Sequence, residues 1–482
     1  MKNSEENSVA RKVILIRAGD SGERLPHALL SLASMLKDEV LILDQAAPAD
    51  VRNHKEALRN AVCVGISTIT GPHIKHSLEV AREIRRINPE TPLVWGGWHP
   101  SLKPEQTLKS DFVDTVIVGQ GEKAFADLVE NIKNGKRSED IISYPYADKA
   151  TFPVYDFSLL DDVERYIIPT YVGSLRYVPI RQISLFSSQG CPFGCTFCAI
   201  ESVYGKHYSG WPIEAVADLV QDCIKKYRIN SVLFDDDNFF IGKKRALEFA
   251  EILLKRGMRI NWSSDARVDT LCSLSPSEWE LLDRSGCKWM LIGAESGAQA
   301  TLDRLNKKIT PEMILNLGRL CRRYNIVPSF SMMVGAPGET DDDIDKTFAL
   351  IDTLKAEAPS SELLLFLYTP YPGTPLYDLS LEMGFKEPGS LEEWSELYLD
   401  IPTVPWVKSG LVERVRRYNR SIPVHRDIGL KHTASYSYNP SIHFKRFRYL
   451  LYRSGKMKKS DALLRYIGRK MAGLKDGPQR KI

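Results

Sequence analysis

The stretch GCPFGCTFCAIE, residues 190–201, carries three of the eight cysteines of this 482-residue chain. Cys191, Cys195 and Cys198 have the spacing C-x3-C-x2-C, whereas the other five cysteines are scattered. Three thiolates on one loop are a natural ligand set for an iron–sulfur cluster. A cluster of four irons held by three cysteines keeps one iron open for a substrate or cofactor. Structural zinc is the alternative, but it needs four ligands and therefore a fourth residue from elsewhere.

Strand and helix patterns repeat on both sides of this cysteine loop. Short apolar runs that predict strands lie at residues 183–187, 231–237, 259–266, 289–295, 328–335 and 362–368. Helical patterns such as 213–227 and 243–257 lie between them. Six parallel strands that alternate with helices predict an α/β fold, a partial six-unit barrel over residues 181–375. In such barrels the catalytic side chains gather at the C-terminal ends of the strands.

Several of these strand ends are polar. The candidates are Asp236 and Asp237 in FDDDNFF, Arg267 in SSDARVD, Glu295 and Ser296 in GAESG, and Gly335 in MMVGAPGET. A row of carboxylates at a strand end must be solvated, paired or used. Asp237 can instead cap a helix, and Gly335 can simply form a turn. Arg267 has the fork geometry that binds a carboxylate through two hydrogen bonds.

The N-terminal part has the same alternation in another arrangement. Strands are expected at residues 12–17, 39–44, 62–67, 92–97 and 114–119, with helical patterns between them, which predicts a doubly wound, Rossmann-like sheet over residues 1–135. Such sheets bind ligands at the carboxyl ends of their strands. The candidate ligand-binding residues in the loops there are Ser67, Thr68, Gly71, Gly96, Gly97, Gly119 and Gly121. The first strand is not followed by G-x-G-x-x-G, so a dinucleotide is not favoured. Residues 136–180 are expected to be a linker.

The motifs of both parts resemble one known family. C-x3-C-x-aromatic-C, with Phe197 in the aromatic position, is similar to the signature of the radical SAM superfamily. The segments GISTITGP, VWGGWHPS and VDTVIVGQGE resemble the cobalamin-binding domain that precedes radical SAM domains in some enzymes. The resemblance implies three cofactors: a [4Fe–4S] cluster on the three cysteines, S-adenosylmethionine (SAM) on the open iron, and cobalamin. The Asp-x-His-x-x-Gly signature of other cobalamin proteins is absent, which implies cobalamin without a histidine ligand.

The resemblance also implies roles for the candidate residues. Asp236 and Asp237 match the region that holds the amino group of SAM, Glu295 and Ser296 the ribose region, and Gly335 the adenine region. Phe197 and Arg267 are assigned to the same cofactor, and the seven residues of the N-terminal loops to cobalamin.

The implied reaction belongs to the group that includes hopanoid methylases, other C-methyltransferases and the anaerobic magnesium-protoporphyrin ester cyclase. Reductive cleavage of SAM gives a 5′-deoxyadenosyl radical, which abstracts hydrogen from an unactivated carbon before methyl transfer from methylcobalamin. Non-methylating oxidation, cyclisation or ring rearrangement of a lipid or tetrapyrrole is the alternative. Modification of RNA is a more remote one. The expected partners are a small-molecule or lipid substrate and an external low-potential electron donor such as flavodoxin or ferredoxin.

The C-terminal extension, residues 376–482, is expected to be basic and mainly helical. Residues 407–482 hold 20 Lys and Arg against 4 Asp and Glu, while the net charge of the whole chain is +4. A helical face that closes the barrel, a surface for anionic lipids and a nucleic-acid contact all fit this charge, although no RNA-binding fold accompanies it. The sequence shows neither a signal peptide nor an apolar run near the roughly 20 residues of a membrane span. We therefore expect a cytoplasmic protein, with peripheral membrane contact through the basic extension as an open alternative.

Overall fold

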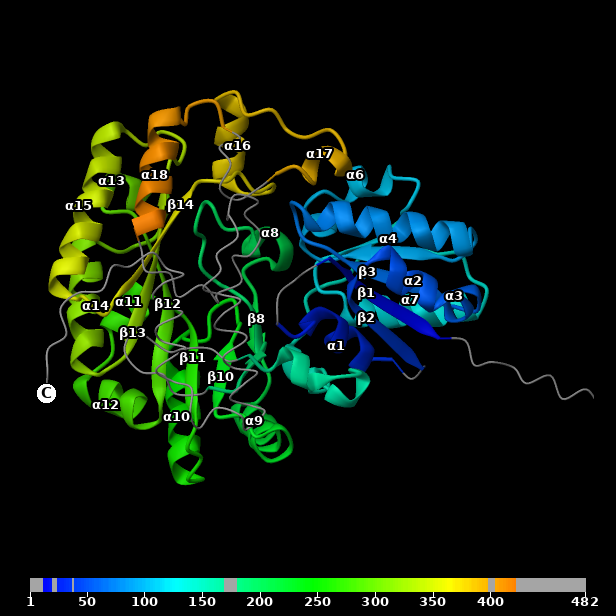
Figure 1. Cartoon of the computed structure of the whole chain (residues 1–482), viewed down its shortest axis with the longest axis horizontal. Coiled ribbons are helices and arrows are strands. Elements are labelled where there is room, and N and C mark those ends of the chain that lie inside the picture. Colours follow the sequence, from blue (N-terminus) through cyan, green and yellow to red (C-terminus); the bar gives the residue numbers. More distant parts are fainter. Residues whose placement is uncertain (1–11, 20–23, 37–38, 169–179, 398–403, 422–482) are drawn as a thin grey trace, which may run out of the picture. The chain divides into compact units, whose positions relative to one another are not determined.

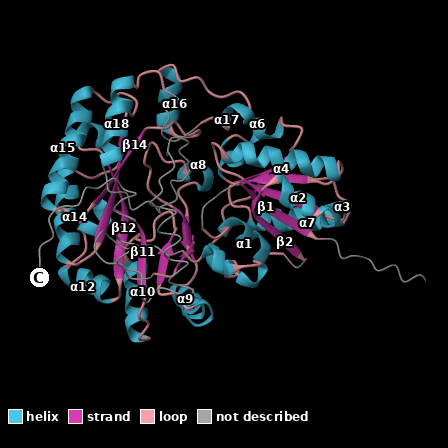
Figure 2. Ribbon diagram, viewed as in Figure 1, coloured by secondary structure: helices cyan, strands magenta, loops and turns pink. Residues whose placement is uncertain are grey.

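The computed structural model describes residues 12–19, 24–36, 39–168, 180–397 and 404–421 (Figure 1). Within these residues the chain forms two parallel sheets of six strands each and one two-stranded ribbon. Figure 2 shows helices packed along the strands, as expected for an α/β fold.

The N-terminal sheet has the strand order β2-β1-β3-β4-β5-β6. Its strands are β1 (Val13–Ala18), β2 (Val40–Ala46), β3 (Cys63–Ser67), β4 (Leu93–Gly96), β5 (Thr115–Val118) and β6 (Ile141–Ser143). The five strands expected from the sequence are confirmed, and their order is that of a doubly wound sheet whose direction of winding reverses between β1 and β3. The sixth strand lies in the segment expected to be a linker, and it pairs with β5.

Helices cover both faces of this sheet because its strands are apolar on both sides. Val13 and Leu15 belong to the same core as residues of α1 (His27–Ser34) and α7 (Glu122–Lys133). Ile14 and Ile16 point the other way and share a second core with α2 (Pro48–Asn53), α3 (Lys55–Arg59) and α4 (His73–Ile87). Two short helices, α5 (Trp98–Leu102) and α6 (Pro104–Leu108), connect β4 to β5.

The connector to the second sheet consists of three short 3₁₀ turns. These are η1 (Lys149–Thr151), η2 (Phe157–Leu159) and η3 (Val163–Tyr166). An aspartate caps each turn by accepting a hydrogen bond from a backbone N–H. The Tyr166 hydroxyl donates to Asp44 at the end of β2 across 2.8 Å, which fixes the connector to the first sheet.

The second sheet has the order β14-β13-β12-β11-β10-β7, with every neighbouring pair parallel. Its strands are β7 (Gln182–Leu185), β10 (Ser231–Phe234), β11 (Asn261–Arg267), β12 (Cys287–Glu295), β13 (Val327–Val334) and β14 (Glu362–Leu367). Sequential order with β7 and β14 at the two edges is the arrangement of an open, partial barrel, which confirms the expectation from the sequence.

The helices between these strands pack on one side of the sheet, and Figure 1 shows α12, α14 and α15 beside β12 and β13. They are α9 (Ile213–Tyr227), α10 (Lys244–Lys255), α11 (Val268–Cys272), α12 (Pro276–Arg284), α13 (Gln299–Arg304), α14 (Pro311–Arg323) and α15 (Asp341–Glu357). The aromatic rings of Phe234 and Trp262, on neighbouring strands, contact Phe249 of α10. This outer layer is therefore a close-packed core.

The inner face of the barrel is more accessible than the outer layer. Along β12, β13 and β14 the side chains that face the helices are buried, whereas alternate residues are partly exposed. The partly exposed, inward-facing residues include Leu233, Asp265, Leu291, Ser331, Met333, Leu364 and Phe366. A closed barrel would fill its interior with buried side chains, so the partial exposure of these residues is consistent with an open, partial barrel.

The C-terminal extension begins as three helices, α16 (Pro375–Glu382), α17 (Leu391–Trp394) and α18 (Ser409–Ser421). Trp394 of α17 is fully buried in the core that contains Ile14 and Ile16, and its Nε1 donates to Gln106 Oε1. The α18 residues Val412 and Val415 are buried, and Asn419 donates to the backbone oxygen of Leu365 in β14. The start of the extension thus covers the β14 edge of the barrel.

The most basic part of the extension, residues 422–482, lies outside the described residues, so its contact with lipid stays a prediction. No helix among the residues that the structure describes is long and apolar enough to cross a membrane.

Candidate active site

The cysteine loop follows a short ribbon rather than a barrel strand directly. β7 ends at Leu185, and β8 (Ser188–Gly190) then pairs antiparallel with β9 (Tyr208–Gly210). The sequence predicted one strand entering the loop. The break arises where Ser187 turns its N–H and hydroxyl to Asp236. Cys191, Cys195 and Cys198 follow, all half-buried, before the short helix α8 (Ile200–Tyr204).

The cysteine loop is fixed to the barrel by backbone hydrogen bonds. Thr196 donates its N–H to the oxygen of Leu305 and its hydroxyl to that of Arg304. Asn306 Nδ2 donates to the oxygen of Gly194 across 2.6 Å. The turn that follows α13 therefore sets the position of the loop between the first and third cysteines.

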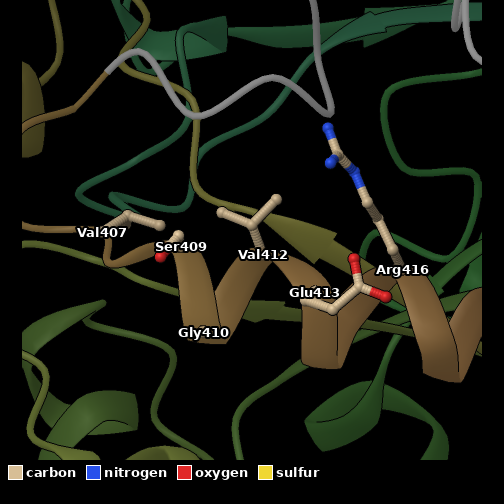
Figure 3. Close-up of a pocket in the computed structure, with 6 residues that line it drawn as sticks. All are labelled: Val407, Ser409, Gly410, Val412, Glu413 and Arg416. Atoms are coloured by element: carbon tan, nitrogen blue, oxygen red, sulfur yellow. The ribbon is translucent and has the colours of Figure 1, made fainter.

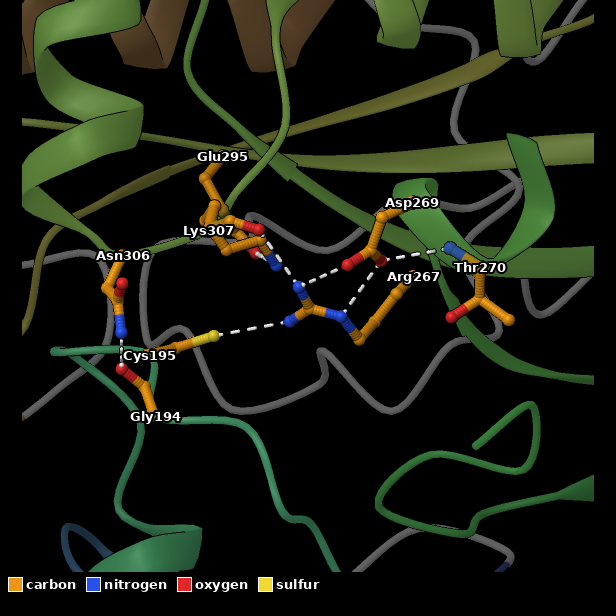
Figure 4. A network of polar contacts seen from close by, with 8 residues as sticks. All are labelled: Gly194, Cys195, Arg267, Asp269, Thr270, Glu295, Asn306 and Lys307. Atoms are coloured by element: carbon orange, nitrogen blue, oxygen red, sulfur yellow. Dashed lines mark hydrogen bonds and ion pairs between the residues drawn. The ribbon is translucent and has the colours of Figure 1, made fainter. Parts of the chain in front are cut away.

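Arg267 at the end of β11 reaches one of the three thiols (Figure 4). Its Nη1 donates to Cys195 Sγ across 3.4 Å, and its guanidinium carbon lies 3.8 Å from the centre of the Phe193 ring. Asp269 receives two hydrogen bonds from the same guanidinium, at 3.0 and 2.9 Å. The sequence predicted a bidentate carboxylate partner for Arg267, and in the structure that partner is Asp269 of the same chain.

The thiols of the cysteine loop need a positively charged ligand, such as iron, to be ionised at neutral pH. Burial raises the pKa of Cys198 to about 12 and also raises the pKa of Cys191. Thiolates at neutral pH therefore depend on bound iron and on neighbouring positive charge such as that of Arg267. Among the described residues, no three His, Cys, Asp or Glu side chains converge as ligands of a single metal ion.

Asp236 and Asp237 at the end of β10 have different surroundings. Asp236 is fully buried and accepts hydrogen bonds from the backbone and hydroxyl of Ser187 and from the hydroxyl of Ser188. Its carboxylate thus ties β10 to the strand that leads into the cysteine loop. Contact between Asp236 and SAM stays a prediction, and three protein donors already occupy its oxygens.

The carboxylate of Asp237 accepts fewer hydrogen bonds from the protein than that of Asp236, so it has more capacity to bind a ligand. One of its oxygens, Oδ2, accepts from the N–H of Gly190, next to Cys191, across 2.7 Å. Burial, together with the charge of Asp236, raises the pKa of Asp237 to about 6. A cationic ligand group would favour the ionised form of this carboxyl. Asp237 is therefore a suitable partner for the amino group of SAM.

Asp235, the first carboxylate of the row, turns toward the N-terminal sheet. Arg24 Nη1 lies 3.2 Å from Asp235 Oδ1, and His27 Nε2 lies 3.7 Å from Asp235 Oδ2. His27 also contacts the hydroxyl of Ser184 in β7 at 3.2 Å. The segment after β1 therefore supplies two basic side chains to the barrel, a contact that no pattern in the sequence indicated.

Glu295 at the end of β12 forms a buried ion pair. Its Oε1 accepts from Lys307 Nζ across 3.0 Å, and both side chains are at least nine-tenths buried (Figure 4). The Glu295 backbone is left-handed, with φ of 65°, and its carboxylate lies where a Cβ on Gly293 would stand. The backbone oxygen of Lys307 also accepts a hydrogen bond from Arg267 Nη2, so Glu295, Lys307, Arg267 and Cys195 form one connected group.

The remaining residues assigned to SAM have structural partners as well. The Ser296 hydroxyl contacts Thr347 at 3.0 Å and accepts from the N–H of Ala298 at the start of α13. Gly335 has φ of 84°, and its N–H donates to Glu339. Phe197 packs on the small core of Leu305, Ala336, Tyr368 and Leu376. Their contacts with SAM stay predictions.

The residues assigned to cobalamin gather at the carboxyl ends of β3, β4 and β5. Gly97 has φ of 98°, and a Cβ there would lie 2.6 Å from the Thr68 oxygen, so the β3 and β4 loops touch. Gly96 is different, because a Cβ on it would meet nothing closer than 3.8 Å. Thr68 is buried, and its hydroxyl has no hydrogen-bond partner among the residues that the structure describes. A Cβ on Gly96 would make only ordinary contacts with Ile117, and this position beside the Thr68 hydroxyl fits a polar ligand on these loops.

The other members of this set lie further along the same edge. Ser67, at the end of β3, is half-buried, and Gly121 precedes α7. A Cβ on Gly71 would stand 2.9 Å from the backbone oxygen of Leu397 in the C-terminal extension. A Cβ on Gly119 would stand 3.1 Å from the oxygen of Val203 in α8. A side chain at Gly71 or Gly119 would therefore crowd a neighbouring backbone oxygen, whether or not a ligand binds.

A surface pocket lies elsewhere, at the start of α18 (Figure 3). It is lined by Val407, Ser409, Gly410, Val412, Glu413 and Arg416. None of the residues that the sequence assigns to a cofactor lines it. Val407 links the pocket to one of them, because its Cγ2 lies 2.8 Å from the position of a Cβ on Gly335.

Two family models match the chain in the order of its two sheets. The model of the B12 binding domain matches residues 12–129, and that of the radical SAM superfamily matches residues 185–351. The chain joins a B12-binding domain to a radical SAM domain. The first match contains the whole Gly-rich edge from Ser67 to Gly121, and the second contains the three cysteines and the four strand ends.

Several known proteins are similar to most of this chain. An uncharacterized methyltransferase of Pyrococcus horikoshii, PH0819, is 27% identical over 370 residues, which cover 74% of this chain and 78% of that protein. The anaerobic magnesium-protoporphyrin IX monomethyl ester cyclase of Rubrivivax gelatinosus is 26% identical over 341 residues, 67% of this chain and 58% of the cyclase. The radical SAM methyltransferase TsrM of Kitasatospora setae has a similar fold, with a TM-score of 0.61 at 19% identity, covering 78% of this chain and 77% of TsrM.

These matches confirm the predicted family, fold class and enzyme class. A radical SAM domain implies a [4Fe–4S] cluster and SAM, and a B12-binding domain implies cobalamin. Sequence reasoning missed Lys307, Asn306 and the segment with Arg24 and His27. A basic turn such as NKK usually lies in solvent, so its letters gave no signal of a buried lysine.

Proposed function

We propose that this enzyme methylates an unactivated carbon of a small molecule in a reaction that depends on cobalamin and SAM. The observation that carries the proposal is the contact between the two candidate cofactor regions. In the B12-binding domain, Trp98 packs edge-on against Tyr204, with ring centres 5.7 Å apart, and Gly119 abuts Val203. Both partners belong to α8, which begins two residues after Cys198. A ligand on the Gly-rich edge would therefore lie beside the cysteine loop.

The cofactors supply the difficult chemistry, since SAM on a reduced cluster yields a radical that abstracts hydrogen, and cobalamin carries a methyl group. The residues of the chain hold and shield these groups. Cys191, Cys195 and Cys198 would bind the cluster, and Asp237 would hold the amino group of SAM. Arg267 donates to Cys195 and keeps positive charge beside the cluster. The cluster requires electrons from outside, which a low-potential protein donor such as flavodoxin or ferredoxin would supply.

The barrel interior is the proposed substrate site. Leu291, Met333, Leu364 and Phe366 give it an apolar wall, and all four are partly exposed. Asp265 of β11 lies on the other side, near Asp235 and Arg24. Burial and the charge of Asp235 raise the pKa of Asp265 well above its usual range. A largely apolar substrate with one hydrogen-bonding group would match these two walls.

A second candidate is a non-methylating reaction on the same cofactors. The similarity to the magnesium-protoporphyrin ester cyclase supports it, because the chain matches this cyclase and the methyltransferase PH0819 at nearly equal identity, 26% and 27%. In that case the apolar wall would still hold the substrate, while cobalamin would assist oxidation or ring closure.

One experiment separates the two candidates. The protein is reconstituted anaerobically with iron, sulfide and hydroxocobalamin, then incubated with SAM labelled in its methyl group and a strong reductant. Label on the bound cobalamin together with deoxyadenosine supports methylation, and deoxyadenosine without label supports the second candidate. Absence of both contradicts both candidates. The Cys195→Ala variant is the control, and it should give no deoxyadenosine.

A further inference from the structure

Gln120, in the loop after β5 of the B12-binding domain, forms a side-chain hydrogen bond to β8, the strand that leads into the cysteine loop. Its Nε2 donates to Gln189 Oε1 across 3.0 Å and to the backbone oxygen of Ala147 across 3.1 Å. Its Oε1 accepts from the N–H of Ala147 across 2.8 Å. The side chain is 6% exposed, and that of Gln189 is 7% exposed. The nitrogen and the oxygen of the buried Gln120 amide therefore both form hydrogen bonds with residues outside the B12-binding domain.

Gln189 lies two residues before Cys191, in β8. Its side chain meets Gln120, and its backbone oxygen accepts from the hydroxyl of Tyr146 across 2.8 Å. The next residue, Gly190, donates its N–H to Asp237. A displacement of Gln189 would therefore move both the first cysteine and the carboxyl that we assign to SAM.

The connector holds the same ribbon from the other strand. The hydroxyl of Ser209 in β9 contacts the hydroxyl of Tyr146 at 2.9 Å and accepts from the N–H of Lys149 at 2.7 Å. Because Ala147 lies between Tyr146 and Lys149, the two hydrogen bonds between Gln120 and Ala147 extend this network to the B12-binding domain. Gln120, the connector and the ribbon form one continuous polar network.

The loop that carries Gln120 is also the loop with two of the predicted cobalamin contacts, Gly119 and Gly121. It has little freedom to move alone. The N–H of Gly119 donates a hydrogen bond to the hydroxyl of Ser101 across 2.9 Å. Glu122 accepts from the hydroxyl of Ser31 in α1 across 2.7 Å. A ligand that shifts this loop would shift Gln120 with it.

We propose that Gln120 is a positioning residue that couples occupancy of the cobalamin loop to the geometry of the cluster strand. This inference rests on the proposed placement of cobalamin on the loop Gly119–Gly121. The coupling is a free energy between two sites, so it must appear as a change in the affinity for one cofactor when the other binds. In a buried network whose polar groups are all hydrogen-bonded, one group cannot shift without the loss of hydrogen bonds to its neighbours. A shift at the cobalamin loop would therefore be passed on to the cluster strand.

The test measures the dissociation constant of hydroxocobalamin for protein with a reconstituted cluster, with and without SAM and without any reductant. The wild-type constants should differ by about fivefold or more, the range of ordinary coupling. Gln120→Ala should bring the ratio close to one while it retains the iron content of the wild type. Gln120→Glu keeps an acceptor for the N–H of Ala147 but cannot donate to Gln189, so it should lose the coupling as well. The second variant covers the case in which the alanine variant does not fold.

Gln106→Ala is the matched control. Gln106 also bridges distant segments, because its Nε2 donates to the oxygen of Pro388 and its Oε1 accepts from Trp394. It has no contact with the cluster strand, so its loss should lower the melting temperature and leave the ratio unchanged. A second readout is amide hydrogen exchange at residues 188–190. Hydroxocobalamin should slow this exchange in the wild type and not in Gln120→Ala.

Two results would overturn the inference. A wild-type ratio of one, or a ratio in both Gln120 variants equal to that of the wild type, would show that Gln120 carries no coupling even though cobalamin binds. Failure of the wild type to bind hydroxocobalamin would instead remove the proposed placement of the cofactor, and the inference with it.

Discussion

Arg267 donates a hydrogen bond to Sγ of Cys195, one of the three thiols in the cysteine loop, across 3.4 Å. Arg267 ends β11 and Cys195 follows β8, so the contact joins the barrel to the loop in front of it. Donors and positive charge next to a cluster sulfur stabilise the electron that the cluster gains on reduction. We therefore predict that the arginine affects the chemistry of a cluster bound to Cys195 as well as the structure of the loop.

The Arg267→Met variant should have a more negative cluster reduction potential than the wild type. The measurement is a redox titration of the reconstituted protein, followed by electron paramagnetic resonance of the reduced cluster. Arg256→Met is the control. Arg256 directly follows α10 and forms ion pairs with Glu214 and Asp218, so its loss should leave the potential unchanged. An unchanged potential at full iron content in Arg267→Met would refute this role.

The buried pair of Glu295 and Lys307 makes a prediction about stability. Lys307→Met leaves a buried carboxylate without its partner, which should cost about 3–5 kcal/mol of unfolding free energy. The double variant with Glu295→Gln should recover part of this loss because no uncompensated charge remains. Urea denaturation of the protein without cofactors measures both.

The exposed pair of Lys346 and Asp342 is the matched control for that experiment. Lys346→Met should change the unfolding free energy by less than about 1 kcal/mol. If Lys307→Met costs no more than Lys346→Met, the pair is not buried in the way described.

Asp265 in the barrel interior makes a prediction about pH. Burial, followed by the charge of Asp235, holds its folded-state pKa well above the unfolded value of about 3.9. Below about pH 4 the carboxyl is protonated in both states and has no effect. As the pH rises, the unfolded chain releases the proton more readily, so the wild type loses stability.

Asp265→Asn removes this loss. The variant should therefore melt at a higher temperature than the wild type at pH 7–8, and the difference should vanish near pH 4. Asp352→Asn, at an exposed carboxylate, should show no such trend. A difference for Asp265→Asn that is constant between pH 4 and pH 8 would disprove the predicted shift.

Variants of the neighbouring glycines Gly96 and Gly97, at the end of β4, should affect different properties, one cobalamin binding and the other stability. Gly97→Ala places a Cβ 2.6 Å from the Thr68 oxygen on a left-handed backbone, which should destabilise the fold by about 1–3 kcal/mol. At Gly96 a Cβ would lie 3.8 Å from the Ile117 oxygen, an ordinary contact distance, so Gly96→Ala should fold normally while it adds a methyl group at the predicted cobalamin-binding edge.

Thermal denaturation and titration with hydroxocobalamin measure the two effects. We expect a lower melting temperature for Gly97→Ala and a weaker cobalamin affinity at an unchanged melting temperature for Gly96→Ala. Normal cobalamin binding by Gly96→Ala would place the cofactor elsewhere on the domain.

The fold was largely predictable because its strands are short apolar runs between amphipathic helices. β1 and β12 could be located from their letters alone, since buried parallel strands need apolar residues on both faces. β6 was missed because it is three half-exposed residues in a segment without periodicity. The separate ribbon of β8 and β9 was missed because SQG and YSG contain no apolar alternation. Tyr146 and Asp237, from distant parts of the chain, hold β8 in place.

The candidate site was predictable in part. The cysteine spacing is local, so Cys191, Cys195 and Cys198 could be identified directly. The carboxylates at the strand ends were identifiable as a group, but the sequence did not separate Asp236, which ties strands together, from Asp237, which has an oxygen to spare. Lys307 and Gln120 were not identifiable, because a buried lysine or glutamine is defined by partners far away in the chain.

The most direct test of the central claim is Mössbauer spectroscopy of the protein reconstituted with ⁵⁷Fe, before and after SAM is added. Three cysteines that hold a [4Fe–4S] cluster leave one iron open, so SAM should change the signal of one iron site in four. The variant with Cys191, Cys195 and Cys198 all replaced by alanine should show no cluster. A wild-type spectrum without a four-iron cluster, or one that SAM does not alter, would contradict the assignment of this loop.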